Sequence, residues 1–523
     1  MRTIFCLFDS LNRTALGCYG GTDIPTPNFD RFAQRAITYD NHFVGSLPCM
    51  PARRDLHTGR LNFMHRSWGP LEPFDNSYPE LLKDAGVYSH LVTDHLHYFE
   101  DGGLTYHSRF ASYDFIRGQE NDPWKAMVQP PMERFREKMA EKNYELGGDG
   151  RVNDPERLRL QHVINKQWMP DEADFPGPRC FKSGFEFLDT NRSEDDWLLH
   201  LECFDPHEPF DAPERFKKHF SKGWNGKVLN WPNYGKVTES PEEIAEIRAN
   251  YAALVAMCDA YFGDLIDYMD AHDMWHDTAL IVTTDHGLLL SEHDWWGKNL
   301  QPYYREISHI PLIIHDPRRP SATGTRISNI TQTYDLMPTI LDLHDVAVPA
   351  EVQGKSALAH IDAERSGEPE YALFSMFGGP MGISDGTYDF YLYPRDIQAL
   401  GLHEYTLMPT HLRSRMVPKE LASAELDRSF GFTKGAPVMR IDALTDARRI
   451  PCVDGNAFQD VGTKLYHTGK DPLQQHPISD PEIENRMTEA ALRILSSHEC
   501  PADFYDWFGL THPEATNDIR ENN

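Results

Sequence analysis

Five short apolar segments, each followed at once by aspartate or histidine, most constrain how this chain can fold. Apolar runs without strict alternation are typical of strands that a parallel sheet buries on both faces under helices. In such open α/β sheets, ligands bind beyond the carboxyl ends of the strands. We therefore expect an α/β fold with its functional site at that edge. The segments and their endings are Thr3–Phe8 with Asp9-Ser10, Tyr88–Val92 with Thr93-Asp94-His95-Leu96-His97, Trp197–Phe204 with Asp205-Pro206-His207, Ala279–Thr284 with Asp285-His286-Gly287, and Ile310–Ile314 with His315-Asp316-Pro317.

Helix signals lie between these segments. Ser240-Pro241-Glu242-Glu243 has the pattern of a capping box with proline at the first helical position. The apolar residues from Ile244 to Met269 follow at spacings of three and four, which predicts one long amphipathic helix on a face of the sheet. Thr26-Pro27 opens a shorter helix in the same way. Cys258 lies on the buried stripe of the long helix, so we interpret it as a core residue.

The character of the sequence changes near residue 365. Arg365–Pro369 has the composition of a linker, so we predict a catalytic α/β domain over 1–365 and a smaller α+β domain over 366–523. Within the first, the stretch from about 100 to 191 is rich in proline, glycine and charge and is expected to be an insertion. The C-terminal elements that we expect are a hairpin turning at Asp385-Gly386, a strand at Lys464–His467, and a helix around Ile483, Met487, Ala491, Ile494 and Leu495.

Charge and composition exclude several classes of protein. The chain has 523 residues, with 51 Lys and Arg against 80 Asp and Glu, a net charge of −29. Phosphate backbones and anionic lipid would repel this surface, so we expect no nucleic-acid and no membrane partner. A small anionic substrate could still enter a locally positive cleft. No apolar run is long enough for a bilayer span, and the N-terminus lacks a signal-peptide core. With eight scattered cysteines and no CxxC pair, we expect free thiols and a cytoplasmic location.

The stretch Cys49-Met50-Pro51-Ala52-Arg53-Arg54-Asp55-Leu56-His57-Thr58-Gly59-Arg60 carries the most specific signal in the chain. It resembles the signature of the sulfatases, a family of the alkaline-phosphatase-like superfamily. That resemblance implies the superfamily's fold, a central, mostly parallel sheet flanked by helices. It also implies that a formylglycine-generating enzyme converts Cys49 to formylglycine, whose hydrated form provides a metal-activated hydroxyl.

The physical chemistry of this stretch agrees with an anion site. Pro51 is well placed to begin a helix, so Cys49 would lie at a helix N-terminus, where unpaired N–H groups and the dipole favour an anion. Arg53 can donate two parallel hydrogen bonds to sulfate or phosphate oxygens. The alternative is a buried, unmodified thiol, the usual fate of a free cysteine.

The resemblance also implies the metal ligands. Asp9 matches the first acidic ligand of the family, and Asp285 with His286 matches the later pair, beside the modified Cys49. Many sulfatases have two adjacent acids where this chain has Asp9-Ser10, and Asp-Asn where it has Asp285-His286. Because imidazole suits manganese, zinc or iron better than calcium, we expect a divalent Mn or Zn ion rather than Ca. This pattern resembles the phosphonate monoester hydrolases and related sulfatases. The alternative is a strand-end hydrogen bond.

Four further residues match positions that bind the anion or move protons in the family. His207, in Phe204-Asp205-Pro206-His207-Glu208-Pro209-Phe210, resembles the histidine that contacts the ester, and Lys298 the anion-binding lysine that assists the leaving group. His95 takes the place of a sulfate-binding lysine, and His97 matches the base that acts on the second hydroxyl. Phosphonate hydrolases lack this base, which favours sulfate esters. As alternatives, the histidines could cap strand ends, and Lys298 could be solvated.

We therefore predict a sulfuric ester hydrolase that acts on small anionic sulfate monoesters, aryl sulfates foremost. In this mechanism Arg53, His95, Lys298 and the metal stabilise the sulfate oxygens, and Lys298 or His207 protonates the leaving oxygen. A phosphonate monoester hydrolase or phosphodiesterase with the same residues is the first alternative, and activity toward both classes is expected. A non-catalytic anion-binding protein with unmodified Cys49 is the second. Relatives in this branch imply a homodimer or a larger homo-oligomer.

Overall fold

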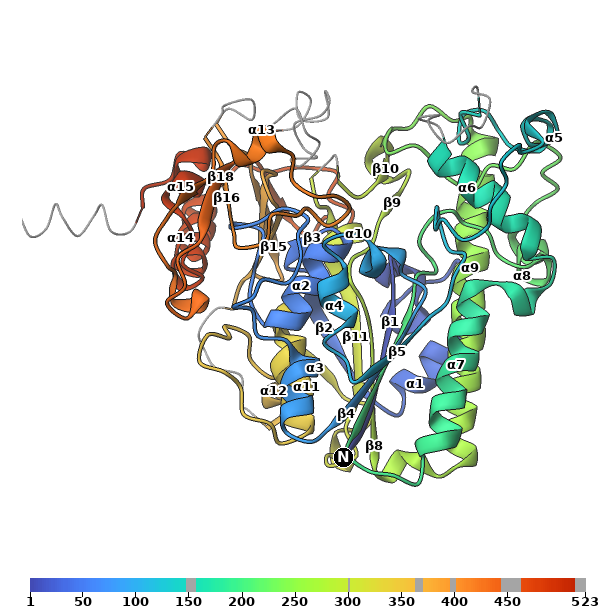
Figure 1. The fold of residues 1–523 in the computed structure, drawn as a ribbon, viewed down its shortest axis with the longest axis horizontal. Helices are drawn as coiled ribbons and strands as arrows, with labels where there is room; N and C mark the ends of the chain where they lie inside the picture. Colours follow the sequence, from blue (N-terminus) through green and yellow to red (C-terminus); the bar gives the residue numbers. More distant parts are fainter. Residues whose placement is uncertain (147–156, 300–301, 363–369, 396–400, 444–461, 513–523) are drawn as a thin grey trace, which may run out of the picture.

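The computed structural model describes residues 1–146, 157–299, 302–362, 370–395, 401–443 and 462–512. Its centre is an eight-stranded sheet in the order β12-β2-β11-β8-β1-β6-β4-β5 (Figure 1). Every neighbouring pair is parallel except the two that involve β11. The α/β architecture predicted from the apolar runs is confirmed. The strands are β1 (Arg2–Phe8), β2 (Ile37–Phe43), β4 (Tyr88–Thr93), β5 (Ser112–Phe115), β6 (Trp197–Cys203), β8 (Thr278–Thr284), β11 (His309–His315) and β12 (Arg326–Gln332).

The register of the central strands places the expected site residues at one edge. Phe8, the last residue of β1, pairs with Cys203 of β6 on one side and with Thr284 of β8 on the other. The residues that follow these three strands therefore leave the sheet at the same level. All the residues of β6 and β8 are buried, as expected for strands covered on both faces.

Strand β11 corrects the expectation that all five apolar runs end at this edge. It runs antiparallel to both β2 and β8, so His315-Asp316 lies at the opposite end of the sheet. There His315 Nε2 lies 2.8 Å from the carbonyl oxygen of Trp275, and Asp316 pairs with Arg319. A buried apolar run indicates a central strand but carries no information about the direction of that strand. Because β11 runs the other way, His315 and Asp316 lie away from the site edge and are structural.

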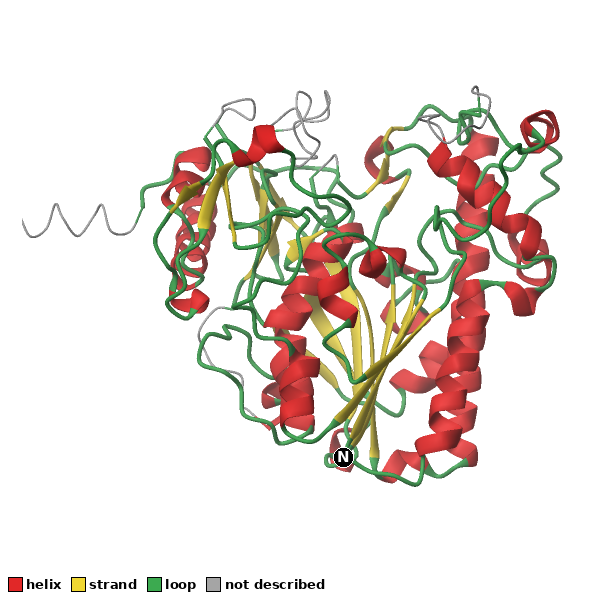
Figure 2. Cartoon of the chain, viewed as in Figure 1, coloured by secondary structure: helices red, strands yellow, loops and turns green. Residues whose placement is uncertain are grey.

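Helices cover both faces of the sheet (Figures 1 and 2). One face packs against α1 (Pro27–Ala33), α7 (Pro176–Asn191) and the long α9 (Pro241–Ala271). The predicted capping box of α9 is confirmed, because Glu243 N donates to Ser240 Oγ and Ser240 N donates to Glu243 Oε2. Cys258 is buried in this layer, as expected. The other face packs against α2 (Cys49–Thr58), α3 (Tyr78–Asp84), α11 (Leu336–Leu343) and α12 (Ala359–Asp362).

The C-terminal part forms a second sheet beside the first (Figure 1). Its order is β19-β15-β14-β13-β3, and the hairpin at Asp385-Gly386 and the helix α14 are confirmed. Strand β3 (Ser46–Leu47) pairs with β13 and directly precedes α2, so this sheet supports the segment that carries Cys49. The expected linker falls on 363–369, outside the described residues, so the domain boundary stays a prediction. The strands are β13 (Ala372–Met376), β14 (Met381–Ser384), β15 (Tyr388–Leu392) and β19 (Lys464–His467), with α14 (Pro481–Ser497).

The stretch from 100 to 191, expected as an insertion, also contributes to the scaffold. It supplies β5 to the central sheet and α7 to its cover. No helix in the described ranges combines the length and the apolar character that crossing a membrane requires. The remaining elements are α4 (Leu104–His107), α5 (Met132–Lys138), α6 (Arg157–Asn165), α8 (Glu214–Phe220), α10 (Arg305–Ser308), α13 (Pro418–Leu421), α15 (Ala502–Phe508), β7 (Gly235–Lys236), β9 (Leu289–Leu290), β10 (Trp295–Gly297), β16 (His403–Thr406), β17 (Glu425–Leu426) and β18 (Met439–Asp442).

Candidate active site

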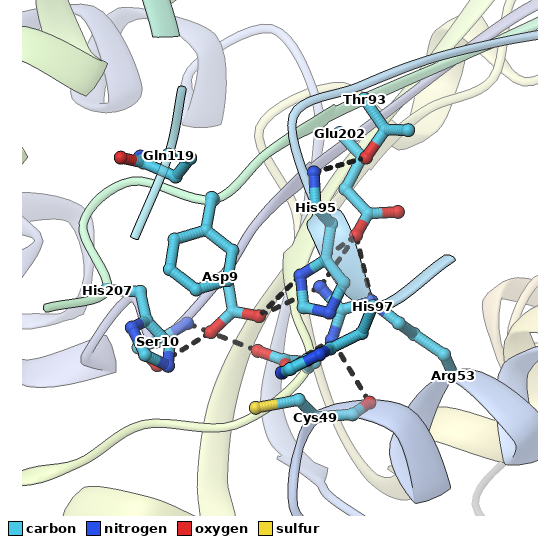
Figure 3. A network of polar contacts seen from close by, with 12 residues as sticks. Asp9, Ser10, Cys49, Arg53, Thr93, His95, His97, Gln119, Glu202 and His207 are labelled. Atoms are coloured by element: carbon cyan, nitrogen blue, oxygen red, sulfur yellow. Dashed lines mark hydrogen bonds and ion pairs between the residues drawn. The ribbon is translucent and has the colours of Figure 1, made fainter. Parts of the chain in front are cut away.

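Four predicted ligands meet at the carboxyl edge of the central sheet. Figure 3 labels two of them, Asp9 and Cys49. Asp9 follows β1, Asp285 and His286 follow β8, and Cys49 is the first residue of α2. One ligand atom from each lies within 4.8 Å of every other, and all four residues are buried. The expected position of Cys49 at a helix N-terminus is confirmed.

His286 is oriented as a metal ligand. Its Nδ1 lies 3.0 Å from the carbonyl oxygen of Gly287, and its Nε2 lies 3.2 Å from Cys49 Sγ. A carbonyl partner requires a proton on Nδ1, so the lone pair is on Nε2 and faces the cluster. Burial, followed by the charge of Lys298, lowers the pKa of His286 well below its usual value. The ring is therefore neutral, as coordination requires.

Arg53 ties the acidic ligands together. Its guanidinium is fully buried and donates to Asp285 Oδ2 at 2.6 Å, to Asp9 Oδ2 at 2.9 Å and to Glu202 Oε1 at 2.8 Å. Burial opposes its charge, but the carboxylates, Glu202 foremost, raise the pKa of Arg53 above its usual range. These contacts hold the two ligand carboxylates in place. The expected contact of Arg53 with a sulfate oxygen stays a prediction.

The charges and donor atoms of the cluster fit a divalent cation. Three buried carboxylates surround the single guanidinium of Arg53, and the next cation, Lys298 Nζ, lies 3.9 Å from Asp9 Oδ1. Buried carboxylates in excess of their partners are costly unless a further positive charge compensates them. Two carboxylates, one neutral imidazole and one helix-terminal side chain form a mixed oxygen and nitrogen donor set that suits a transition metal or zinc.

Ser10 connects the two acidic ligands with Lys298. Its N–H donates to Asp285 Oδ1 at 3.1 Å, and its hydroxyl donates to Asp9 Oδ1 at 2.7 Å. The same hydroxyl accepts a hydrogen bond of 3.0 Å from Lys298 Nζ. Burial opposes the charge of Lys298, but the acidic groups around it, Cys49 and Glu208 first, raise its pKa. The lysine therefore keeps its positive charge beside the ligands.

His95 and His97 flank the other side of Asp9 (Figure 3). His95 is fully buried, and neither of its ring nitrogens has a hydrogen-bond partner among the described residues. Its Nδ1 lies 3.7 Å from Asp9 Oδ2, and burial, with Arg53, lowers its pKa. His97 Nδ1 lies 2.6 Å from Glu100 Oε2. Unpartnered imidazole atoms in a buried site require a ligand or a water to satisfy them.

His207 comes from the loop after β6. Its Nδ1 lies 2.6 Å from the carbonyl oxygen of Glu208, and its ring packs on Phe204 with 4.1 Å between the centroids. Phe204 also packs against the ring of His95, with 5.1 Å between the centroids, so His95 and His207 share this aromatic neighbour. The structure thus gathers all nine predicted site residues at one edge. Their chemical roles stay predictions.

Sequence reasoning missed several residues that support the site. Glu202 accepts from Arg53 and also from the Tyr98 hydroxyl at 2.8 Å. The signal was present, because Glu202 is the one acidic residue within the apolar run Trp197–Phe204. The sequence carries no comparable signal for Glu208 and Tyr234. These residues are 26 positions apart, and only the fold brings their side chains into contact.

Comparison with known proteins agrees with this geometry. The family model described as Sulfatase matches residues 2–346. The multifunctional alkaline phosphatase superfamily protein PehA of Trinickia caryophylli is 26% identical over 381 residues, 64% of this chain and 71% of that protein. The N-acetylglucosamine-6-O-sulfatase of Bacteroides thetaiotaomicron is 25% identical over 398 residues, 68% and 69% of the two chains. The phosphonate monoester hydrolase of Agrobacterium radiobacter shares the fold, with a TM-score of 0.62, 16% identity, and 95% and 96% of the two chains covered.

Proposed function

The chain belongs to the sulfatase family, and from this premise we propose that it hydrolyses small sulfate monoesters, aryl sulfates foremost. The proposal includes formylglycine at position 49 and a divalent ion held by Asp9, Asp285 and His286. The observation that carries this proposal is the buried cluster formed with Cys49, which lies at the N-terminus of α2. Its sulfur atom lies within 4.8 Å of a ligand atom of each of those three residues. The named sulfatase relative supports sulfate esters as the substrate class.

Two groups beyond the unmodified chain complete this chemistry. When present, hydrated formylglycine supplies the attacking hydroxyl and the divalent ion lowers the pKa of that hydroxyl. His286 favours Mn or Zn over Ca, because calcium prefers an all-oxygen shell. Maturation would need a formylglycine-generating enzyme. A homodimer or larger oligomer and a cytoplasmic location complete the proposal.

The remaining residues receive roles from their positions. Arg53 holds the ligand carboxylates of Asp9 and Asp285 in one geometry. Lys298, cationic and buried, attracts the sulfate anion and stabilises charge on its oxygens. His97 engages Glu100 through Nδ1, which leaves Nε2 to accept a proton from the second hydroxyl at position 49. His95 would donate to a sulfate oxygen, and His207 would protonate the leaving oxygen through Nε2, because its Nδ1 is engaged by the carbonyl oxygen of Glu208.

Hydrolysis of phosphonate monoesters or phosphodiesters is the second candidate. His286, where many sulfatases have asparagine, favours it, and a phosphonate monoester hydrolase has the same fold. Both substrate classes present a tetrahedral centre with similar charge to the same cationic groups. Activity toward both classes is therefore part of the proposal.

One set of assays tests these alternatives. The protein is coexpressed with a formylglycine-generating enzyme and loaded with Mn or Zn. Its kcat/KM is then compared on 4-nitrophenyl sulfate, a phenylphosphonate monoester and a phosphodiester, with Cys49→Ala as the control. Preference for the sulfate supports the proposal, and preference for a phosphorus ester supports the second candidate. No turnover of any ester and an unmodified Cys49 peptide by mass would instead indicate an anion-binding protein.

A further inference from the structure

Glu208 places an additional buried carboxylate beside the candidate active site. It follows His207 directly on the loop after β6, and its side chain is 2% exposed. Burial opposes ionisation, but the charges of His207 and Lys298 and a hydrogen bond from Tyr234 lower the pKa of Glu208. The group is therefore an anion within a site that must bind an anion. Such a charge weakens substrate binding unless it serves another purpose.

The contacts of Glu208 point to His207. Its Oε1 accepts a hydrogen bond from the Tyr234 hydroxyl. Its Oε2 is buried, has no hydrogen-bond partner among the described residues, and lies 3.5 Å from His207 Nδ1. The carbonyl oxygen of Glu208 lies 2.6 Å from the same nitrogen. Two acceptors of one residue therefore face His207 Nδ1.

This arrangement fixes the orientation and the tautomer of the His207 ring. A proton on Nδ1 satisfies the Glu208 carbonyl, and the nearby carboxylate stabilises the ring when Nε2 is protonated as well. Tyr234 holds the Glu208 carboxylate in place. The Tyr234 ring is itself fixed by its close packing on Gly297, where an added Cβ would lie 2.5 Å from a ring atom. We call this chain of contacts, from Tyr234 through Glu208 to His207, the relay. It leaves Nε2 as the ring nitrogen that can exchange a proton with the substrate.

Lys298, the other candidate for protonating the leaving oxygen, is directed elsewhere. Its Nζ donates to Ser10 Oγ at 3.0 Å and lies 3.9 Å from Asp9 Oδ1. One of its hydrogens therefore points to Ser10, at the metal-ligand end of the site. The carboxylate that faces the His207 imidazole is that of Glu208, whose Oε2 lies 3.5 Å from Nδ1.

Building on the proposed function, we propose that Glu208 is a positioning residue that makes His207 the general acid for the leaving group. As the new oxygen–sulfur bond forms, the bond from sulfur to the ester oxygen breaks and its electron pair stays on that oxygen. The proton on His207 Nε2 moves to the same oxygen, so an alcohol or phenol leaves. His207 becomes neutral and Glu208 stays ionised. Solvent takes up the proton that the attacking hydroxyl loses and supplies one to Nε2 for the next cycle.

A series of aryl sulfates tests this role, because a general acid helps basic leaving groups far more than acidic ones. The variants are Glu208→Gln, Tyr234→Phe and His207→Ala, with exposed Glu214→Gln as the matched control. We expect Glu208→Gln to lower kcat/KM for phenyl sulfate by about 10²-fold, at least tenfold more than for 4-nitrophenyl sulfate. Tyr234→Phe should act in the same direction with a smaller effect, and Glu208→Asp should restore part of the loss.

A double variant provides a second readout that a purely structural role would not move. Adding Glu208→Gln to His207→Ala should cause no further loss. Equal losses on all leaving groups would overturn this inference. If the wild-type protein turns over no sulfate ester at all, the proposed function itself fails. If the wild-type protein is active and Glu208→Gln is unaffected, only the relay is refuted.

Discussion

Cys49 Sγ lies 3.2 Å from His286 Nε2, although the two residues are 237 positions apart in the chain. Strand β8 delivers His286 to the carboxyl edge of the sheet, and β3, paired with the C-terminal sheet, positions the start of α2 opposite it. The contact therefore depends on both sheets. It brings the thiol at the start of α2 to the neutral nitrogen of His286, a predicted metal ligand.

Replacement of Cys49 tests the nucleophile. Cys49→Ala removes the side chain that maturation converts, so turnover should fall by about 10³-fold or more, while the stability of the fold changes little. Steady-state assays on 4-nitrophenyl sulfate and a thermal melt check both expectations. A variant with near-normal turnover would show that the nucleophile lies elsewhere. Cys258→Ala, a change in the core under α9, is the matched control for loss of a buried thiol and should retain kcat/KM.

Arg53→Met tests whether the guanidinium holds the ligand carboxylates. The change leaves Asp9, Asp285 and Glu202 buried without their shared partner, so the free energy of unfolding of the metal-free protein should fall by about 3–5 kcal/mol. Urea denaturation measures this loss. The matched control is Arg215→Met, which breaks an exposed ion pair with Glu172 and should cost less than about 1 kcal/mol. Similar losses for the two variants would contradict the role of Arg53.

Metal removal tests the donor set. A chelator should abolish turnover and lower the melting temperature, because an ion at about 100 times its dissociation constant stabilises the folded state by about 2.7 kcal/mol. Readdition of Mn or Zn should restore activity better than readdition of Ca, because of the imidazole of His286. Full activity in the metal-depleted protein, or better recovery with Ca, would disagree with this interpretation of the site.

His57 provides a pH-dependent stability test inside α2. Burial lowers its pKa to about 3, and its Nδ1 lies 2.8 Å from Ser77 Oγ. Between pH 6.5 and about 3 the unfolded chain binds a proton that the folded chain does not, so this histidine destabilises the fold as the pH falls through that window. We expect His57→Gln to reduce the slope of unfolding free energy against pH by about 1.4 kcal/mol per unit between pH 4 and 6. An unchanged slope in His57→Gln would refute the assignment.

Several elements could be predicted because their signals are local. The runs that became β1, β4, β6 and β8 are apolar without alternation, and the capping box at Ser240 marks the start of α9. Polar strand ends and the stretch that begins at Cys49 located the site. These signals depend on neighbouring residues, which a sequence displays directly.

Other features depend on contacts between distant segments and could not be predicted. The direction of β11 is set by its antiparallel pairing with β2, a strand with the partly polar sequence Ile37–Phe43 that gave no clear signal. The pairing of β3 with β13 joins residues more than 300 positions apart. Glu202 showed its acidic character in an apolar run, but its partner Arg53 became evident only in the fold.

A crystal structure of the matured protein with anomalous data across the absorption edge of the bound metal tests the central claim most directly. We predict formylglycine at position 49 and a single divalent ion coordinated by Asp9, Asp285 and His286. A plain thiol at position 49, with no anomalous peak between those three side chains, would contradict the account.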